Sequence, residues 1–522
     1  MQPEPTTHTA AILGAGFGGL GMAAQLKRAG IDDFVVLERN DGVGGVWRNN
    51  DYPGAACDTE AQIYNYSFFP HLTVSRMYAG RDELLAYLER MVDYFSFSEQ
   101  LHLGTEVVTA CWEEFESRWR LTAADSQVYY ARFLIPAWGQ LNLPSAPRYP
   151  GLSSFAGSIF HSAQWDHGVE LKGKRVLSIG TAASAVQYIP EVAKVAAELV
   201  VFQRSANWML PRNQVIFSQE ELNAFQASPD LFEASRDNIH QAREHGFERT
   251  RHGSDAQLEG MNQALAHLAA QVPELELRQK LTPDYEFGCK RILRSDDYYP
   301  ALMRPNVELV TGPISRVVPE GVVLADGSLH EGDVIIFGTG FKSQAFHGAL
   351  RIFGRDGVDL AERWGDSPEA YLGMTVDGFP NMFMIYGPNT NLNHNSIISM
   401  LEIQQKYVTD MLHEMRAEEG SWVEVSPATL ELYNCALQEE LKDSAFASNC
   451  SSWYKNPAGR IINNWSGSVE DYRKIAAWNR SDFTTDSERG AQELVEAGAA
   501  VGESRRGGTD LDSFLSSFMY GE

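Results

Sequence analysis

The chain of 522 residues carries 43 Lys and Arg against 69 Asp and Glu, which gives a formal net charge of −26. At roughly 100 to 200 residues per domain, this length predicts two or three domains around a large buried core. The negative field argues against nucleic acid and anionic membrane surfaces as partners, so local basic groups must capture any anionic ligand.

The cysteines indicate the redox compartment. They are odd in number, scattered and without a Cys-x-x-Cys pair, a pattern typical of a reducing compartment. The amino terminus lacks a basic region followed by an apolar run, and no stretch of about 18 consecutive apolar residues occurs. The sequence therefore predicts a soluble, cytoplasmic protein. The five cysteines are Cys57, Cys111, Cys289, Cys435 and Cys450.

A glycine-rich turn follows the first apolar run. Gly14 permits a tight turn, Gly16 lets the backbone approach a pyrophosphate, and Gly19 lets a helix pack closely on a strand. Glu38 lies near the position expected for an acceptor of a ribose 2′-hydroxyl. The order strand, helix, strand around the turn predicts a βαβ unit, with these elements at residues 10–13, 20–28 and 34–37.

Two loops rich in Gly and Pro come next, at residues 41–47 and 52–58. Such loops expose backbone and suit a wide planar cofactor. Asp58 ends the second loop, and the alternative interpretation of this residue is a turn-capping carboxylate. Residues 60–135 combine a predicted helix with β-like runs, which indicates an accessory sheet. A Pro-rich crossing between domains follows at residues 136–150.

A second βαβ unit is predicted from the strand at residues 175–179 and the helix that Gly180 opens. Its middle glycine is replaced by Ala182, whose methyl group would hold a pyrophosphate slightly off the backbone. Arg204 ends the next strand, where the first unit has Glu38. An arginine there pairs with a 2′-phosphate and predicts NADPH over NADH. The alternative is an arginine that merely extends into solvent at a strand end.

Residues 213–280 are helical in pattern and predict an insertion. Ser218 and Glu221 form a capping box. An apolar stripe of Leu258, Met261, Leu265 and Leu268 predicts a core-facing helix. Further on, the adjacent cations Lys290 and Arg291 are either a solvated turn or a local anion site. Predicted later elements are strands at residues 307–310 and within 333–341, a helix at 397–411 and a tail that is partly disordered.

Several segments together resemble one family. Phe155 to Asp166 reads Phe-x-Gly-x-x-x-His-x-x-x-Trp-Asp, although His161 taken alone favours a core histidine. With the Gly-Gly-x-Trp segment ending at Trp47, the Tyr-Pro-Gly-x-x-Cys-Asp segment ending at Asp58, and the Lys-Arg pair, the chain resembles the type I Baeyer-Villiger monooxygenases. Trp138 and Phe337 depart from the family pattern, as does Ala182.

The resemblance implies an α/β fold of two Rossmann-like dinucleotide-binding domains with a helical insertion. The implied division is an FAD-binding domain at 1–145 and 380–480, an NADPH-binding domain at 150–212 and 288–379, an insertion at 213–287 and a tail at 481–522. Implied catalytic residues are Arg291 and Asp58. Implied cofactor-binding residues are Gly14, Gly16, Phe17, Gly19, Glu38, Gly45, Val46, Trp47, Asp58, Tyr64, Gly180, Thr181, Ala182, Ser184, Ala185, Arg204, Ser205, Lys290, Gly340 and Trp453.

The implied activity is FAD- and NADPH-dependent insertion of one oxygen atom of O₂ next to a ketone carbonyl, which gives an ester or lactone. A monomer or weak homo-oligomer without a metal is expected. Two enzyme alternatives stay open: an N- or S-oxygenating flavin monooxygenase, and a flavin reductase, although a disulfide reductase requires a redox cysteine pair. A non-catalytic NADPH-binding regulator is the alternative that is not an enzyme.

Overall fold

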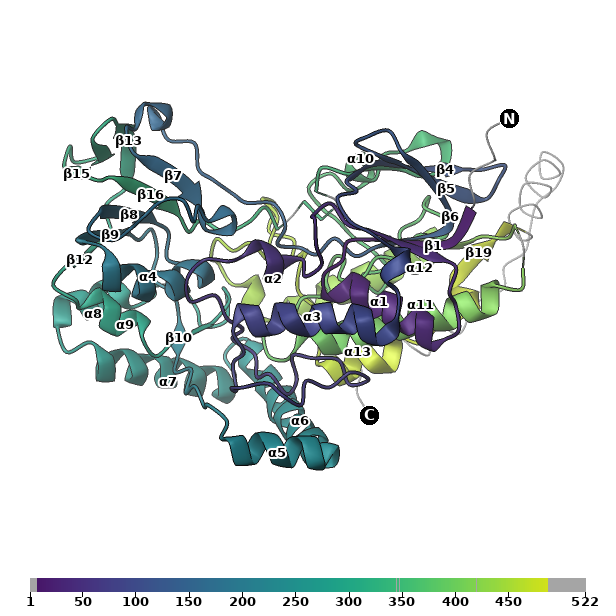
Figure 1. Ribbon diagram of the computed structural model, residues 1–522, viewed down its shortest axis with the longest axis horizontal. Coiled ribbons are helices and arrows are strands. Elements are labelled where there is room, and N and C mark those ends of the chain that lie inside the picture. Colours follow the sequence, from purple (N-terminus) through teal and green to yellow (C-terminus); the bar gives the residue numbers. More distant parts are fainter. Residues whose placement is uncertain (1–6, 344, 347, 419, 487–522) are drawn as a thin grey trace.

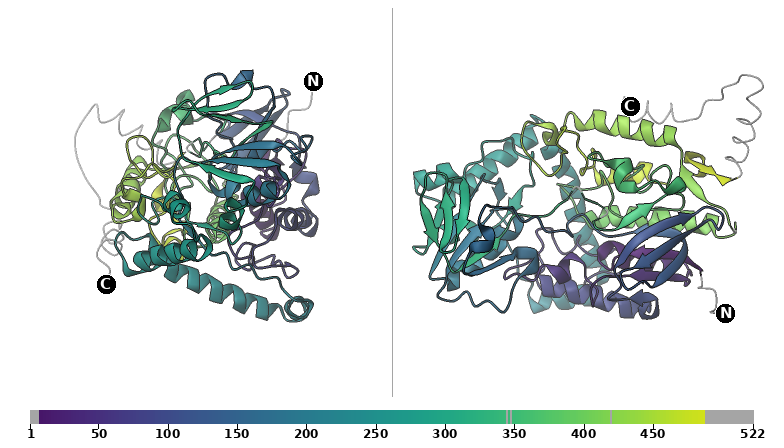
Figure 2. Two further views of the ribbon diagram at one scale, coloured as in Figure 1. Left: turned by 90° about the vertical axis from the view of Figure 1, so that its left-hand side faces the viewer. Right: turned by 90° about the horizontal axis from the view of Figure 1, so that it is seen from above.

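The computed structural model describes residues 7–343, 345, 346, 348–418 and 420–486. These residues form two lobes, each built around a sheet with parallel strands at its centre (Figure 1). Helices α5, α6 and α7 run along the lower side of both lobes in that view. The right-hand view of Figure 2 separates the blue and purple amino-terminal strands from the teal second lobe.

The first lobe contains a seven-stranded sheet of order β17-β4-β5-β6-β1-β2-β3. Strand β1 lies inside this sheet and pairs in parallel with β2 and β6, while β4, β5 and β6 form an antiparallel meander. The strand bounds are β1 Thr7–Leu13, β2 Phe34–Leu37, β3 Leu101–His102, β4 Val107–Glu113, β5 Arg118–Ala123, β6 Val128–Pro136 and β17 Arg351–Phe353.

Helices bury both faces of this sheet. On one face, α1 packs against α3 and α11, and their apolar residues share one core with those of α12 and α13. On the other face, α10 and a second apolar cluster that includes Trp112 and Trp119 cover the meander. The helix bounds are α1 Phe17–Arg28, α3 Arg81–Phe95, α10 Leu360–Trp364, α11 Ile397–Met415, α12 Pro427–Leu441 and α13 Val469–Ile475.

The second lobe contains a parallel five-stranded sheet of order β12-β9-β8-β16-β7. Its strands are almost continuously apolar because both faces are covered. Helices α4 and α9 pack on one face, and an antiparallel sheet of β13, β14 and β15 packs on the other. The bounds are β7 Ser158–His161, β8 Arg175–Ile179, β9 Glu198–Phe202, β12 Val307–Val310, β13 Ile314–Val318, β14 Gly321–Leu324, β15 Leu329–Glu331, β16 Val334–Phe337, α4 Ala183–Val195 and α9 Tyr298–Leu302.

The predicted helical insertion is present and its start is confirmed in detail. Ser218 and Glu221 form the expected capping box at the start of α5. The predicted apolar stripe on α7 is wrong at one end, because Leu258 is 47% exposed whereas Leu268 is 2% exposed. The paired strands β10 and β11 flank the insertion. The bounds are β10 Met209–Leu210, α5 Gln219–Ala227, α6 Pro229–His245, α7 Asp255–Gln271, α8 Leu275–Leu281 and β11 Leu293–Arg294.

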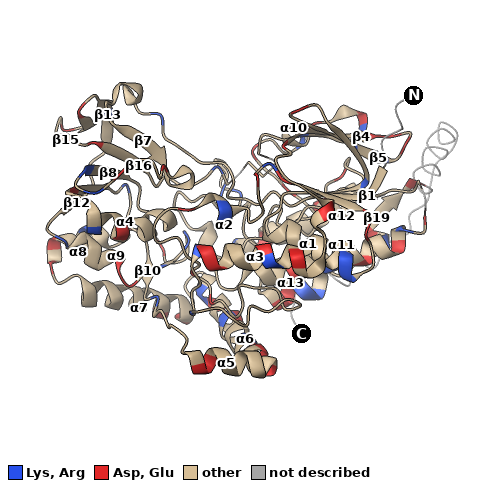
Figure 3. Cartoon of the chain, viewed as in Figure 1, with Lys and Arg blue, Asp and Glu red and all other residues tan. Residues whose placement is uncertain are grey.

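The α/β fold class with two Rossmann-like units is therefore confirmed. Short elements complete the chain: α2 Val46–Asn49, β18 Val423–Val425 and β19 Phe483–Thr485. Strand β19 pairs with β18, so the predicted tail begins as ordered structure, and its part beyond residue 486 lies outside the described residues. Acidic positions are spread over helices of both lobes (Figure 3). In the part of the chain that the structure describes, no helix is both long enough and apolar enough to span a bilayer.

The cysteine spacing did not reveal one covalent link. Cys289 and Cys450, 161 residues apart, form a disulfide, which the scattered cysteines without a Cys-x-x-Cys pair did not indicate. Cys57, Cys111 and Cys435 are free. A pairing over such a separation leaves no local spacing signal, so the sequence pattern had no means of showing it.

We predict that Trp119→Ala destabilises the first lobe. Trp119 is fully buried, and its indole Nε1 donates to the Pro380 carbonyl oxygen at 2.8 Å, which joins β5 to the returning chain. The lost packing should lower the free energy of unfolding by about 3–5 kcal/mol, measured from the urea midpoint. The control is Phe115→Ala in the neighbouring turn, where the side chain is 100% exposed. Equal midpoints for the two variants would contradict this account.

Candidate active site

The first nucleotide turn joins the carboxyl end of β1 to α1. Gly14 has a φ of +103°, and a Cβ there would lie 2.9 Å from the Ala137 carbonyl oxygen. A Cβ on Gly19 would lie 1.8 Å from the Gly14 carbonyl oxygen, so only glycine lets the helix start this close to the strand. The first turn of α1 carries no acidic side chain, and the helix dipole there favours an anion.

Glu38 holds this turn in place. Its buried carboxylate accepts a hydrogen bond from the Ala15 backbone N–H at 2.7 Å through Oε2. Its Oε1 accepts from the backbone N–H and the side-chain Nδ2 of Asn40 at 2.8 and 2.7 Å. The sequence located this acid correctly beside the turn, but these hydrogen bonds were not predicted. A ribose hydroxyl would therefore donate a hydrogen bond to a carboxylate that already accepts hydrogen bonds from the backbone.

A second glycine pair and an aromatic wall lie opposite the turn. A Cβ on Gly45 would lie 2.9 Å from the Gly16 Cα, so the two backbones face each other without side chains between them. The Trp47 indole N–H donates to the Tyr64 hydroxyl at 3.3 Å. The predicted residues that line this half of the cavity are Gly14, Gly16, Phe17, Glu38, Gly45, Val46, Trp47, Asp58 and Tyr64.

The second nucleotide turn repeats the geometry of the first. Gly180 has a φ of +106°, and a Cβ there would lie 2.4 Å from the Gly338 carbonyl oxygen. Ala182 is the residue before α4 and faces the cavity in an exposed position. Ala185, like Gly19 in the first unit, lies behind the turn and lets the helix pack on a strand. The predicted residues that line this half are Gly180, Thr181, Ala182, Ser184, Arg204, Ser205, Lys290, Gly340 and Trp453.

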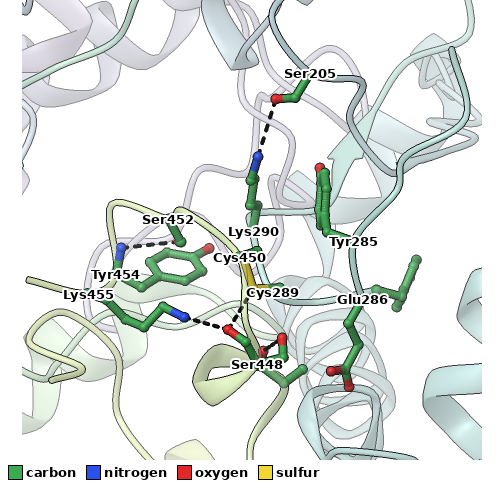
Figure 4. Close-up of a disulfide and its surroundings, with 12 residues drawn as sticks. Ser205, Tyr285, Glu286, Cys289, Lys290, Ser448, Cys450, Ser452, Tyr454 and Lys455 are labelled. Atoms are coloured by element: carbon green, nitrogen blue, oxygen red, sulfur yellow. Dashed lines mark hydrogen bonds between the residues drawn. A yellow bond between two sulfur atoms is a disulfide. The ribbon is translucent and has the colours of Figure 1, made fainter. Parts of the chain in front are cut away.

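Two cations converge beside the second turn. The Lys290 ammonium donates to the Ser205 hydroxyl at 3.2 Å and lies 4.2 Å from the centre of the Tyr285 ring (Figure 4). Burial and the nearby Arg204 guanidinium lower the pKa of Lys290. Because like charges repel, an anion between Arg204 and Lys290 would relieve an unfavourable interaction. The sequence placed these residues in separate segments, and the structure brings them together.

Asp58 and Arg291 form an ion pair that joins the two lobes. Nη2 of Arg291 lies 2.7 and 2.9 Å from the two carboxylate oxygens of Asp58. Burial raises the pKa of Asp58, but the Arg291 charge and hydrogen bonds overcome this and hold it below its usual value. Asp58 in turn raises the pKa of Arg291, so both groups are charged. The Arg291 side chain is 38% exposed because it faces the cavity.

Further polar residues surround this pair, and sequence patterns did not reveal them. Arg243 of α6 makes a two-pronged contact with Glu60 at 2.7 to 3.0 Å, and Arg212 donates to the Cys57 carbonyl oxygen at 2.9 Å. Burial raises the pKa of Tyr386 to about 12, while Arg291 opposes that rise. Arg243 and its partner lie 183 residues apart, so no local spacing signals their pairing.

A loop after residue 447 closes one side of the cavity. Trp453 packs on Tyr454 with 4.6 Å between ring centres, and its carbonyl oxygen accepts from Asn463 Nδ2 at 2.6 Å. The Tyr454 hydroxyl donates to Asn393 Oδ1 at 2.6 Å. Residues 451–453 line the cavity together with Arg291. The loop is thus anchored at its carboxyl end and faces the ion pair.

The Phe-x-Gly-x-x-x-His-x-x-x-Trp-Asp segment contributes to the packing of the second lobe. His161 ends β7 and is 4% exposed, with Nδ1 accepting from the Ala163 backbone N–H at 3.1 Å. Burial lowers its pKa, so the ring is neutral. Trp165 packs on Phe160 and Tyr188. The segment therefore packs the second lobe behind the cavity, as the core interpretation of His161 expected.

A single cavity of about 1340 Å³ lies between the lobes and contains both turns, the two cations and the ion pair. The glycines leave room for backbone contact with two pyrophosphates, and the wall of Trp47 and Tyr64 suits a planar ring system. The residues present therefore fit FAD and NADPH. Trp138, which departs from the family pattern, lines the same cavity, and its buried indole Nε1 contacts no acceptor among the described residues.

Comparison with known proteins agrees with this architecture. Residues 11–223 match the family model described as pyridine nucleotide-disulphide oxidoreductase. A Baeyer-Villiger monooxygenase of Pseudomonas aeruginosa is 40% identical over 482 residues, which are 91% of this chain and 92% of that protein. A Baeyer-Villiger monooxygenase of Streptomyces coelicolor is 39% identical over 467 residues, 89% of this chain and 90% of its own.

Solved structures show the same fold. A closed crystal structure of cyclohexanone monooxygenase superposes with a TM-score of 0.81 at 28% identity, over 94% of this chain and 98% of that one. A crystal structure of OTEMO in complex with FAD and NADP gives a TM-score of 0.81 at 27% identity, over 94% and 99% of the two chains. From the two glycine turns, the shared cavity and relatives that match along almost their whole length, we conclude that the chain belongs to the Baeyer-Villiger monooxygenase family.

Proposed function

We propose that this protein uses FAD and NADPH to insert one oxygen atom of O₂ next to a ketone carbonyl, giving an ester or lactone. The observation that carries the proposal is the Asp58–Arg291 ion pair, which stands in the cavity between the two nucleotide turns. FAD, when bound, supplies the redox chemistry that links NADPH to O₂. The chain's own residues bind, orient and charge-balance the reactants.

The binding roles follow the two lobes. The FAD-binding part, proposed as residues 1–145 and 380–480, holds the dinucleotide at the first turn, with Trp47 and Tyr64 beside the ring. The NADPH-binding part, proposed as residues 150–212 and 288–379, holds the second dinucleotide at Gly180. Arg204 and Lys290 bind the 2′-phosphate, with Ser205 beside them. Trp453 covers the nicotinamide.

Arg291 acts on negative charge that develops on oxygen atoms in the cavity. A fixed guanidinium in a site that excludes water stabilises such charge without reorganising as the reaction proceeds. Asp58 binds the same guanidinium through both carboxylate oxygens and so sets its orientation. The carboxylate also keeps the site electrically balanced while an anion is absent. The pair therefore favours an oxygen nucleophile and a ketone over an electrophilic oxygen and an amine or sulfide.

The partners and location are part of the proposal. The substrates are a small ketone and O₂, and the protein acts in the cytoplasm as a monomer or weak homo-oligomer. A screen of linear, cyclic and bulky ketones against amines and sulfides, with product identification, tests the reaction class. Exclusive formation of N- or S-oxides would show that the reaction is that of an N- or S-oxygenating monooxygenase. NADPH-dependent O₂ uptake with an ester product would exclude a non-catalytic regulator.

The first prediction here concerns FAD. Gly16→Val places a branched side chain on the backbone that faces Gly45, in the space proposed for the pyrophosphate. The purified variant should be largely colourless while the wild type is yellow, as measured by absorbance and FAD release. The control is Gly246→Val, because a Cβ at Gly246 meets no atom within 4 Å. Normal FAD content in a folded Gly16→Val protein would move the FAD site elsewhere.

A second prediction concerns coenzyme choice. Arg204→Ala removes a charge-assisted contact with the 2′-phosphate, which contributes about 1.5–3 kcal/mol and so about ten- to hundredfold in discrimination. The KM for NADPH should rise by that factor, while the KM for NADH stays nearly constant. Arg90→Ala on the exposed side of α3 is the matched control. Equal use of both coenzymes by the wild type would overturn the assignment.

The third prediction separates two half-reactions. Arg291→Ala should bind FAD and still oxidise NADPH, yet lower ester or lactone formation by at least roughly 10²–10³-fold. Arg291→Lys should recover only part, because an ammonium cannot hold both carboxylate oxygens and a further anion in a plane. The measurements are anaerobic flavin reduction and product analysis. Near-normal ester formation by Arg291→Ala would reduce this residue to a structural or phosphate-binding role.

A further inference from the structure

The disulfide lies directly behind two segments that line the cavity. Cys289 immediately precedes Lys290 and Arg291, and Cys450 immediately precedes residues 451–453. All five of these following residues line the cavity. Figure 4 shows the sulfur–sulfur bond between the chain that carries Lys290 and the loop that carries Ser452. One covalent bond therefore fixes the loop proposed to cover nicotinamide to the segment that carries the proposed catalytic arginine.

Several backbone hydrogen bonds in the amino-terminal half of this loop are local. The Cys450 backbone N–H donates to the Ser448 carbonyl oxygen at 2.8 Å. Ser452 accepts from the backbone N–H groups of Tyr454 and Lys455 at 3.2 and 3.3 Å. These hydrogen bonds shape the loop but all stay within it. The disulfide joins this half of the loop to a segment 161 residues away, so its state decides how firmly the loop is held.

The two sulfur atoms differ in access. Cys289 is fully buried, whereas Cys450 is only partly buried and so is reached first by a small solute. In a reducing compartment, a disulfide is usually transient, catalytic or redox-sensing rather than structural. This pair combines such chemistry with a position against the active-site loop.

We propose that Cys289 and Cys450 form a reversible dithiol–disulfide site, oxidised by hydrogen peroxide and reduced by a small dithiol, that holds residues 448–453 against the cavity. The proposal rests on the proposed NADPH-dependent function. Oxidation keeps the loop over the nicotinamide end, so NADP⁺ binds more tightly and leaves more slowly. Reduction releases the amino-terminal half of the loop and lets the coenzyme exchange.

The chemistry balances without a further reactant. The Cys450 thiolate attacks one oxygen of hydrogen peroxide, the O–O bond breaks, and a sulfenic acid and hydroxide form. The Cys289 sulfur then attacks the Cys450 sulfur and expels hydroxide, which takes up the released proton as water. Two thiols and one peroxide thus give one disulfide and two waters. A dithiol reverses the change by donating two electrons and two protons as it becomes a disulfide.

The proposed activity supplies the oxidant when ketone is lacking. NADPH, one proton and O₂ then yield NADP⁺ and hydrogen peroxide, since the oxygen has no carbonyl to enter. Peroxide released from the cavity oxidises the pair behind the lining segments, and slower NADP⁺ release lowers further consumption of NADPH. The disulfide would thereby restrain futile turnover until a dithiol restores the open loop.

The test compares full-length, FAD-loaded wild type after hydrogen peroxide and after dithiothreitol, each reagent being removed before measurement. Alkylation and peptide mass spectrometry report the Cys289–Cys450 link, and titration with NADP⁺ reports affinity. If reduction lowers the closed population to about a tenth to a third, the apparent Kd rises about three- to tenfold. The link and the higher affinity should appear together after peroxide and vanish together after dithiothreitol.

Matched variants separate this pair from other thiols. Cys289→Ser and Cys450→Ser should bind NADP⁺ like reduced wild type after either treatment. Cys435→Ser, at a free and exposed position on α12, should respond like wild type. FAD absorbance confirms that each variant is folded. The comparison of oxidised and reduced wild type tests the proposal even if a variant fails to fold.

Two results would overturn the proposal: alkylation of both Cys289 and Cys450 after peroxide, or equal NADP⁺ affinity in both states. The test also distinguishes this proposal from the proposed function. If NADP⁺ affinity depends on the redox state but the protein oxygenates no ketone, only the proposed ketone oxygenation would be rejected. If neither the oxidised nor the reduced protein binds NADP⁺, both proposals would be overturned, because the loop would then have no coenzyme to cover.

Discussion

The ion pair of Asp58 and Arg291 connects the two lobes at the cavity. A guanidinium taken into a protein interior is costly unless a carboxylate and hydrogen bonds compensate it. Asp58 follows the loops of the first lobe, and Arg291 follows the helical insertion, 233 residues later. Each charge therefore needs the other segment in place. Removing either partner would take away the main opposite charge beside the other, so the pair links the two lobes electrostatically.

The glycine turns impose a second constraint of a purely steric kind. At Gly14 and Gly180 the backbone adopts positive φ and passes so close to a neighbouring strand that a Cβ would overlap a carbonyl oxygen. The two turns open toward the same cavity from opposite lobes. Arg291 lines the same cavity as both turns. Backbone geometry therefore shapes the two ends of the cavity, and the side chains between them set its charge and access.

Much of this could be predicted from the sequence, for identifiable reasons. Strands β2, β8 and β12 match their predicted bounds because buried parallel strands are short apolar runs ended by Gly or polar residues. The start of α1 was predicted three residues late, since glycines at a helix start carry no periodic signal. Glu38 was located from its distance to Gly14, but its hydrogen bonds to Ala15 and Asn40 follow from tertiary geometry. Leu258 was wrongly assigned to the core, because periodicity shows which face of a helix is apolar but not how far along the helix other elements bury that face.

The pairs that no pattern showed are those that close the cavity over long separations: Arg243 with Glu60, and Cys289 with Cys450. Arg243 lines the same cavity as the cations Arg204 and Lys290, and Cys289 directly precedes Lys290 in the sequence. The chain as a whole carries −26, so its distant field repels the anionic coenzyme, and attraction begins only where low-dielectric walls concentrate the field of these local cations. Salt screens the distant repulsion more strongly than the contact inside the cavity. The net negative charge therefore discourages nonspecific anions, while Arg204 and Lys290 supply local positive charge to the cavity wall beside Ser205.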